Sequence, residues 1–241
     1  MERAVFDRMA DLGDAHWWFV ARRRILASVI ERVVRPPKAA RILEIGCGTG
    51  HNLAMLSRFG DVSATELDDP AREMATARSG RPVARIALPD RGALQNGHYD
   101  LIALLDVLEH VSDDAGSLKV IHDLLKPGGA ILLTVPANPW MWSAHDEAHH
   151  HYRRYRKREI EVFAQDAGLT IQLLSYFNSL LFPLVAAARF AGKIATRESS
   201  DDVMPVAPIN SLLTGIFGLE SYLVGRVQMP IGVSLIGVLR R

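Results

Sequence analysis

Short apolar segments alternate with helical segments through the first 136 residues, and this alternation constrains the fold more than any other feature. Strands are expected at residues 41–45, 62–67, 83–87, 99–105 and 130–135. Helices are expected at residues 51–59, 70–78 and 113–125. Strands separated by helices at this pace predict an α/β fold with a parallel, doubly wound sheet. Hydrophobic residues make up 49% of the chain, enough for helices to cover both faces of such a sheet.

The whole chain of 241 residues fits one domain with a modest insertion. An apolar helical face at 17–34, ended by Pro36 and Pro37, predicts a helical cap at the N-terminus. In chain order we expect an N-terminal helical cap (1–38), a Rossmann-like core (39–176), an apolar helical insertion (177–228) and a final strand (229–241).

The C-terminal half departs from strict alternation. A helix is expected at 159–167 with Gly168 as its C-cap, followed by a strand at 170–176. Two apolar helices are then expected at 177–194 and 210–228, separated by the polar, proline-containing residues 196–208, before a strand at 231–239. The longest weakly charged stretch, 177–188, is far shorter than the roughly 20 residues of a membrane span, so no transmembrane helix is expected.

The net charge and the cysteine content indicate which partners and which cellular compartment to expect. The formal net charge is +1, which gives no general attraction to nucleic acid or anionic lipid. Cys47 is the only cysteine, so an intrachain disulfide is excluded and a reducing compartment is expected. Acidic residues at positions 2, 7, 11 and 14 interrupt any apolar signal region, and we therefore expect a cytoplasmic location.

A glycine cluster follows the first expected strand, in the order Glu44-Ile-Gly-Cys-Gly-Thr-Gly50. Glycines at a strand-to-helix turn let the backbone approach a ligand closely. Glu66 lies 20 residues after Gly46, at the end of the next strand, where a carboxylate can accept hydrogen bonds from ribose hydroxyls. A dinucleotide-binding loop does not fit, because its third glycine would fall at position 51, which is His51. A nucleoside-triphosphate loop does not fit either, because no Lys-Ser or Lys-Thr pair follows the glycines.

These residues, with two later blocks, resemble the class I S-adenosylmethionine-dependent methyltransferases. The second block is Tyr99-Asp-Leu-Ile-Ala-Leu-Leu-Asp-Val-Leu-Glu-His110, and the third is Leu125-Lys-Pro-Gly-Gly-Ala-Ile-Leu-Leu-Thr-Val-Pro136. The resemblance implies a seven-stranded Rossmann-like sheet whose last strand is antiparallel. It also implies S-adenosylmethionine as cofactor and S-adenosylhomocysteine as product.

The same resemblance implies which residues contact the cofactor. The three loop glycines would lie under its methionine part, with Glu44 bracing the loop, and Glu66 would bind the ribose. Ala87 and Leu88 would lie at the adenine. The implied set is Arg22, Glu44, Gly46, Cys47, Gly48, Gly50, Glu66, Leu67, Ala87, Leu88, Leu105 and Asp106.

Residues 145–158 concentrate polar groups after the fifth expected strand. His110 and His149 are candidate bases, since histidine titrates near neutrality. Five cations in the six residues 153–158 suit an anionic group on the acceptor. The expected substrate contacts are His145, His150, Tyr152, Arg153 and Arg154. This pattern, with the tryptophans near position 17, resembles a bacterial small-molecule subgroup of the family and implies an N-terminal lid over the cofactor.

His145 and His149 stand four apart, as a pair of metal ligands on one helix face would. Asp146 occupies the place of the zinc-protease glutamate, however, and we expect no metal site. The expected partner is a small, hydrophobic or lipid-like acceptor, with its O, N or C atom open. The apolar insertion suits that acceptor, a membrane surface or a homodimer contact equally. A protein that binds the cofactor without turnover, and a nucleic-acid methyltransferase, are the alternatives. No Asn/Asp-Pro-Pro-Tyr/Phe tetrapeptide supports the latter.

Overall fold

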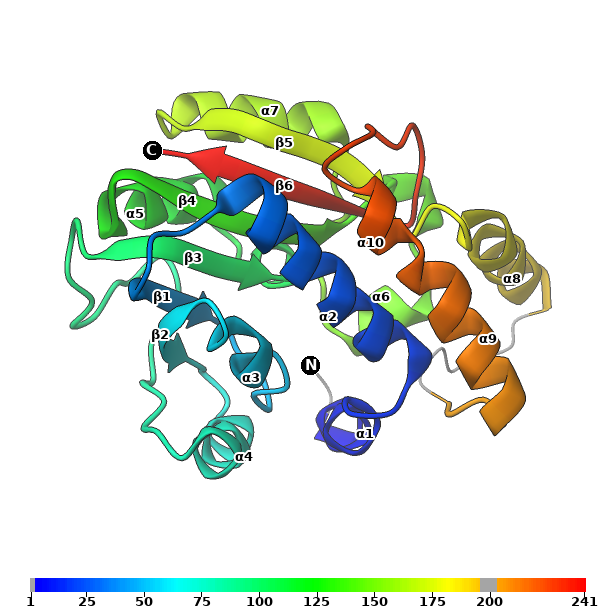
Figure 1. The fold of residues 1–241 in the computed structure, drawn as a ribbon. Helices are drawn as coiled ribbons and strands as arrows, with labels where there is room; N and C mark the ends of the chain where they lie inside the picture. The colour runs from blue at the N-terminus through cyan, green and yellow to red at the C-terminus, as the bar shows by residue number, and fades with distance from the viewer. Residues whose placement is uncertain (1–2, 196–202) are drawn as a thin grey trace.

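A mixed β-sheet runs through the centre of the computed structural model, which describes residues 3–195 and 203–241 (Figure 1). Within those residues the sheet has six strands in the order β2-β1-β3-β4-β6-β5. They are β1 (Ala40–Ile45), β2 (Gly60–Thr65), β3 (Tyr99–Leu105), β4 (Leu125–Pro136), β5 (Thr170–Phe177) and β6 (Ser234–Arg240). Only β6 is antiparallel to its neighbours, β4 and β5. The predicted doubly wound sheet with an antiparallel last strand is confirmed.

The predicted strand at 83–87 is wrong, and the described sheet therefore has six strands where seven were expected. The Ala84 amide donates to the Ala64 carbonyl at 3.0 Å, and the Glu66 amide donates to the Ala84 carbonyl at 2.9 Å. Pairing does not extend beyond this single bridge. Pro82, which has no amide hydrogen, stands directly before the pairing segment and cannot contribute a ladder bond.

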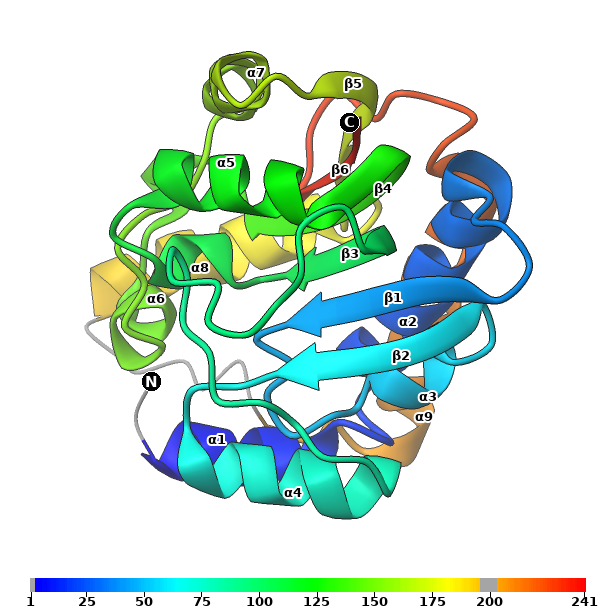
Figure 2. The same cartoon turned by 90° about the vertical axis from the view of Figure 1, so that its left-hand side faces the viewer.

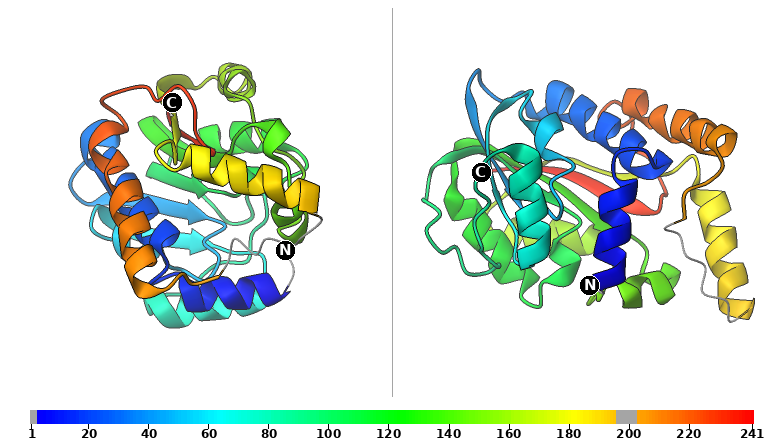
Figure 3. Two further views of the ribbon diagram at one scale, coloured as in Figure 1. Left: turned by 90° about the vertical axis from the view of Figure 1, so that its right-hand side faces the viewer. Right: turned by 90° about the horizontal axis from the view of Figure 1, so that it is seen from below.

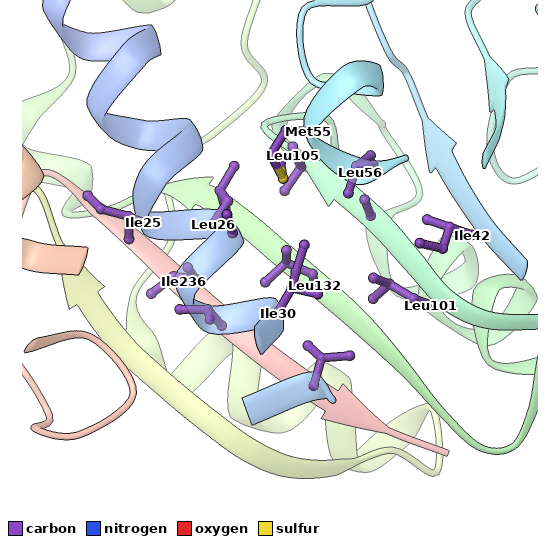
Figure 4. Packing of buried hydrophobic residues seen from close by; sticks show 14 of the residues in the cluster. Ile25, Leu26, Ile30, Ile42, Met55, Leu56, Leu101, Leu105, Leu132 and Ile236 are labelled. Carbon is purple, nitrogen blue, oxygen red and sulfur yellow. The ribbon is translucent and has the colours of Figure 1, made fainter. Parts of the chain in front are cut away.

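One face of the sheet is covered by α2 (Trp17–Val29), which continues as one π-helical turn (Ile30–Val34) and confirms the helix predicted at 17–34. Figure 4 shows Ile25, Leu26 and Ile30 of this helix against the sheet residues Leu132 and Ile236. Two further helices, α3 (Leu53–Leu56) and α4 (Asp69–Ser79), contribute buried residues to the same cluster.

The opposite face is covered by α5 (Asp114–Leu124) and α7 (Lys157–Asp166), so helices lie on both faces as expected (Figure 2). Leu118 and Ile121 of α5 and Ile160 of α7 are fully buried against this face. The Asp113 side chain caps α5 by accepting from the Gly116 amide. The C-cap of α7 is Ala167, one residue before the predicted Gly168, and Gly168 takes the left-handed conformation beyond it with a φ of +74°.

The N-terminal cap contains a helix, α1 (Arg3–Leu12), that the sequence did not predict separately. The turn between α1 and α2 is fastened to the glycine loop. Asp14 pairs with His51 at 3.0 Å and with Arg78 at 2.8 Å. A Cβ added to Gly13 would lie 2.4 Å from the His51 ring, so the turn and the loop are in direct contact. The cap therefore closes over the end of β1.

The apolar insertion forms α8 (Phe182–Ala195), α9 (Ala207–Gly218) and α10 (Glu220–Leu223). α8 stands at the carboxyl end of the sheet, while α9 lies along α2 (Figure 3). Asn210 joins α9 to α2 by accepting from the Trp17 amide at 2.8 Å. Residues 196–202 of the expected polar connection lie outside the described residues. Of the helices that are described, none has the length and apolar character needed to cross a membrane.

The remaining short helices lie between strands at the same end of the sheet. They are η2 (Leu108–His110), η3 (Pro139–Met141) and α6 (Ala144–Ala148). η2 follows β3, whereas η3 and α6 follow β4. Both connections therefore begin at the carboxyl ends of parallel strands.

Glu220 joins α10 to the turn that leads into α8, and we predict that Glu220→Ala destabilises the fold. Its fully buried carboxyl accepts from the amides of Asn178, Ser179 and Leu180 at 2.6–2.8 Å. Burial raises its pKa, while these three bonds oppose the rise. Removing the acceptor leaves the buried Asn178 amide and two partly buried amides without this partner, at a cost of about 2–4 kcal/mol in the free energy of unfolding.

Chemical denaturation of Glu220→Ala and Tyr222→Ala provides the comparison. Tyr222 lies on the same short helix but is 65% exposed, so its replacement should change the free energy of unfolding by less than about 0.5 kcal/mol. Equal stability of the two variants would contradict the structural role given to Glu220.

Candidate functional site

A cavity of about 1160 Å³ opens at the carboxyl ends of the parallel strands. Segments that follow β1, β2, β3 and β4 line it, together with residues of α1, α2 and α8. Its volume lies above the usual range of roughly 300–1,000 Å³ for a small-molecule pocket. The cavity therefore has room for two ligands side by side.

The glycine loop forms the floor of the cavity after β1. Gly48 has a φ of +55°, and a Cβ placed on it would meet nothing within 4 Å. Its backbone therefore faces open space in the cavity lining. Gly50 has a different reason to be glycine, because a Cβ there would lie 3.0 Å from the Ala75 Cα on α4. Gly50 serves packing and does not line the cavity.

Glu66 supports the loop from the end of β2. Its Oε2 accepts from the Gly48 amide at 2.8 Å, and its Oε1 accepts from the amides of Leu67 and Asp68 at 2.7 and 2.9 Å. A carboxylate offers about four lone-pair positions, so Oε2 keeps the capacity to accept from a ligand hydroxyl. Glu66 is 8% exposed and lines the cavity.

Glu44 lies beneath the loop and does not reach the cavity. Its Oε1 accepts from the Asn52 side-chain amide at 2.8 Å. Burial raises the pKa of Glu44 to about 7, against the opposing effect of that hydrogen bond. Burial likewise raises the pKa of the Cys47 thiol, which leaves it protonated and unreactive at neutral pH.

Arg22 of α2 reaches across to the ends of β3 and β4. Its Nη2 donates to Asp106 Oδ2 at 2.6 Å and to Thr134 Oγ1 at 2.8 Å, and its guanidinium lies 5.0 Å from the Trp18 ring centroid. Asp106 adopts a φ of +57°, and its amide donates to the Thr134 carbonyl. Arg22 and Asp106 both line the cavity and present paired charges next to the glycine loop.

Asp146 organises the opposite wall from within α6. Its fully buried carboxylate accepts from His151 Nδ1 at 3.0 Å and from Arg154 Nε at 2.8 Å, and it lies 3.6 Å from the Arg189 guanidinium of α8. Burial alone would raise the pKa of Asp146, but these three partners hold it well below its usual range. Breaking such a buried ion network by removing one partner costs several kcal/mol.

Five histidines line the cavity on this side and are called the histidine wall below: His110, His145, His149, His150 and His151. The ring centroids of His145 and His149 are 4.1 Å apart, and those of His110 and His151 are 4.7 Å apart. Burial lowers the pKa of His110 to about 3, helped by His151 and His149, so its imidazole is neutral near pH 7. Next to it, burial raises the pKa of Glu109 well above its usual range, and Asp106 adds to the effect.

Most residues expected from the sequence line this one cavity. They are Arg22, Gly46, Cys47, Gly48, Glu66, Leu67, Ala87, Leu88, Leu105, Asp106, His110, His145, His149, His150, Tyr152 and Arg154. Glu44, Gly50 and Arg153 do not line it. Arg153 turns away because its guanidinium pairs with Asp114 of α5 at 2.7 Å.

The structure also places residues in the cavity that the sequence did not single out. Phe6 and Met9 of α1 line it, since the cap folds over the loop. Glu109 and His151 lie within the motifs already quoted, but their burial and mutual approach depend on tertiary packing. The signal that could have identified His151 is the Asp146 carboxylate five residues earlier, which now holds its ring.

Comparison with known proteins gives the family. A methyltransferase-domain model matches residues 19–174, well over half of the chain. The ubiquinone biosynthesis O-methyltransferase of Xanthomonas axonopodis pv. citri (strain 306) is 27% identical over 158 residues, covering 58% of this chain and 66% of that enzyme. The chain therefore spans slightly less than two thirds of this relative's length.

Solved structures share the fold. An S-adenosylmethionine-dependent methyltransferase from Mesorhizobium loti matches with a TM-score of 0.59 at 17% identity, covering 90% of this chain and 95% of that one. The [4+2]-cyclase SpnF matches with a TM-score of 0.59 at 19% identity, covering 95% and 84%. At such identities the structures establish the fold alone. On the evidence of the family model, the chain belongs to the class I S-adenosylmethionine-dependent methyltransferases.

Proposed function

We propose that the protein transfers a methyl group from S-adenosylmethionine to a small apolar acceptor that carries a polar group. The observation that carries this proposal is that the glycine loop and Glu66 line the same cavity as the histidine wall. A methyl transfer requires two ligands in contact, and the cavity supplies two chemically different halves.

The half bordered by β1 and β2 fits an adenosine ligand. Gly48 leaves open space where a side chain would stand, and Glu66 can accept from a ribose hydroxyl. Ala87 and Leu88 supply apolar surface for the adenine. Asp106 can accept from the ammonium of the methionine part, and Arg22 beside it can bind the carboxylate. The reactive methyl would then point towards the histidine wall.

The half bordered by α8 fits an apolar acceptor. Leu184, Val185 and Ala188 of α8 line this side of the cavity. His145, His149 and His150 contribute polar groups to the same side. Arg154 is already engaged with Asp146, so we assign the contact with an anionic or polar group of the acceptor to the histidines. The name of the Xanthomonas relative, an O-methyltransferase, favours oxygen as the methyl-accepting atom.

The protein's own contribution to the reaction is alignment and exclusion of water. S-adenosylmethionine, when bound, supplies an electrophilic methyl group on a sulfonium. The α1–α2 cap covers the glycine loop, and His110 and His149 form the wall that the acceptor must contact. We propose these two histidines as catalytic residues that hold the acceptor's reactive atom towards the methyl group.

Gly48→Val should abolish binding of S-adenosylmethionine, because the new side chain would occupy the open space above the loop. Gly80→Val is a matched control. Gly80 has a similar φ of +68°, and a Cβ there also meets nothing within 4 Å, but it caps α4 outside the cavity. Both variants carry a similar backbone strain of about 1–3 kcal/mol. Calorimetry should show loss of affinity in Gly48→Val alone, and equal affinities would contradict the proposed cofactor site.

Leu184→Glu should raise the KM for an apolar acceptor by about tenfold or more, since it places a charge on the apolar wall. Leu212→Glu is the matched control, because Leu184 and Leu212 are 60% and 62% exposed but only Leu184 lines the cavity. A set of phenols with apolar substituents of increasing size is first screened as acceptors. The assay then follows release of S-adenosylhomocysteine with the most active phenol of the set. An unchanged KM in Leu184→Glu, or a screen in which only hydrophilic compounds react, would refute the acceptor assignment.

A further inference from the structure

Three groups of the histidine wall lie close enough to share one ion. A ligand atom from each of Glu109, His110 and His151 lies within 4.8 Å of the others. Glu109 and His110 belong to η2, directly after β3, while His151 comes from the segment after α6. Two imidazoles and a carboxylate form a ligand set that catalytic zinc sites use, with a fourth position open.

Glu109 is the member that most requires a partner. It is 1% exposed, and neither carboxyl oxygen has a hydrogen-bond partner among the described residues. A buried carboxyl without a partner is costly, and such groups are normally paired or coordinate a metal. A dication placed between this carboxyl and the two imidazoles would satisfy both oxygens' need for a positive partner.

His151 is already oriented as a ligand. Its Nδ1 lies 3.0 Å from Asp146 Oδ1, and the buried Asp146 side chain is fixed in turn by Arg154 Nε at 2.8 Å. With its Nδ1 hydrogen donated to a carboxylate, a neutral imidazole presents the lone pair of Nε2. A carboxylate behind the ring is the usual support of a metal-bound histidine.

Backbone contacts hold the two contributing segments together. The Tyr152 amide donates to the Glu109 carbonyl at 2.8 Å, directly after His151 in the chain. The buried Tyr155 hydroxyl donates to the Leu108 carbonyl at 3.1 Å, on the other side of Glu109. The three side chains are therefore brought together by the fold before any ion binds.

We infer that Glu109, His110 and His151 bind a divalent transition-metal ion of the zinc type, with an open coordination position that faces the cavity. Imidazole nitrogens select such ions over magnesium or calcium. This inference differs from the expectation of no metal site, which rested on the spacing of His145 and His149.

The metal's role rests on the proposed function. A hydroxyl oxygen of the acceptor would occupy the open position and lose its proton to solvent, since a bound dication lowers the pKa of a coordinated oxygen. A lone pair of that oxygen would form the new bond to the methyl carbon. The carbon–sulfur bond would break with its electron pair remaining on sulfur, which gives the ether and neutral S-adenosylhomocysteine.

The test starts from the full chain after a chelator has removed any bound metal. Co²⁺ is then titrated into the protein, and binding is followed by the visible absorption of the bound Co²⁺. We expect one Co²⁺ per chain, displaced by Zn²⁺ and not by Mg²⁺. Glu109→Gln and His151→Ala should each weaken binding about tenfold or more. His122→Ala should leave it unchanged, because His122 lies on α5 outside the cavity. His110→Ala gives a third ligand variant should His151→Ala fail to fold.

Absence of saturable Co²⁺ binding in the wild type would overturn the inference. So would equal affinity in the wild type and in folded Glu109→Gln, whose side chain keeps the original shape. Calorimetry with S-adenosylmethionine on the same samples separates the two proposals. If the chain binds Co²⁺ at these residues but does not bind S-adenosylmethionine, the metal site stands and the proposed function is contradicted. If it binds S-adenosylmethionine but not Co²⁺, only the metal site is contradicted.

Discussion

The shared direction of the parallel strands is the constraint on which the rest of this structure depends. The carboxyl ends of β1, β2, β3 and β4 all lie on the same side of the sheet. The segments that follow these strands therefore meet there. The glycine loop, Glu66, Asp106 and the histidine wall each occupy one of those segments or a helix just beyond it. Helices packed on both faces leave this edge as the place where polar groups and a ligand can meet.

The sequence predicted the sheet and the meeting of the glycine loop with Glu66 well, because both depend on local signals. Alternating apolar segments and helical spacing predicted every described strand and the two layers of helices. The spacing of the loop glycines and the carboxylate at the end of the next strand are both visible in the sequence. In the structure the Gly48 amide donates to Glu66, so the two do lie together. The apolar insertion was also predicted, although only α8 reaches the cavity while α9 covers α2.

The wall of the cavity formed by η2 and the segment after β4 was less predictable, because it depends on contacts between segments. Arg153 and Arg154 are neighbours in sequence, yet one pairs with Asp114 outside the cavity and the other with the buried Asp146 within its wall. No periodicity distinguishes them. In the same way, Glu109 becomes a buried carboxyl only because the segment after α6 folds over η2. At 83–87 an apolar pattern suggested a strand, but pairing stops after one bridge.

The most direct measurement is a crystal structure of the full chain with S-adenosylhomocysteine. We expect the ribose hydroxyls to lie on Glu66 and the amino-acid part to lie beside the glycine loop and Asp106. The sulfur should face His110 and His149 across open space. An S-adenosylhomocysteine bound outside this cavity would contradict this expectation. A sulfur directed away from the histidine wall would contradict it equally, because the acceptor would then have to enter from elsewhere.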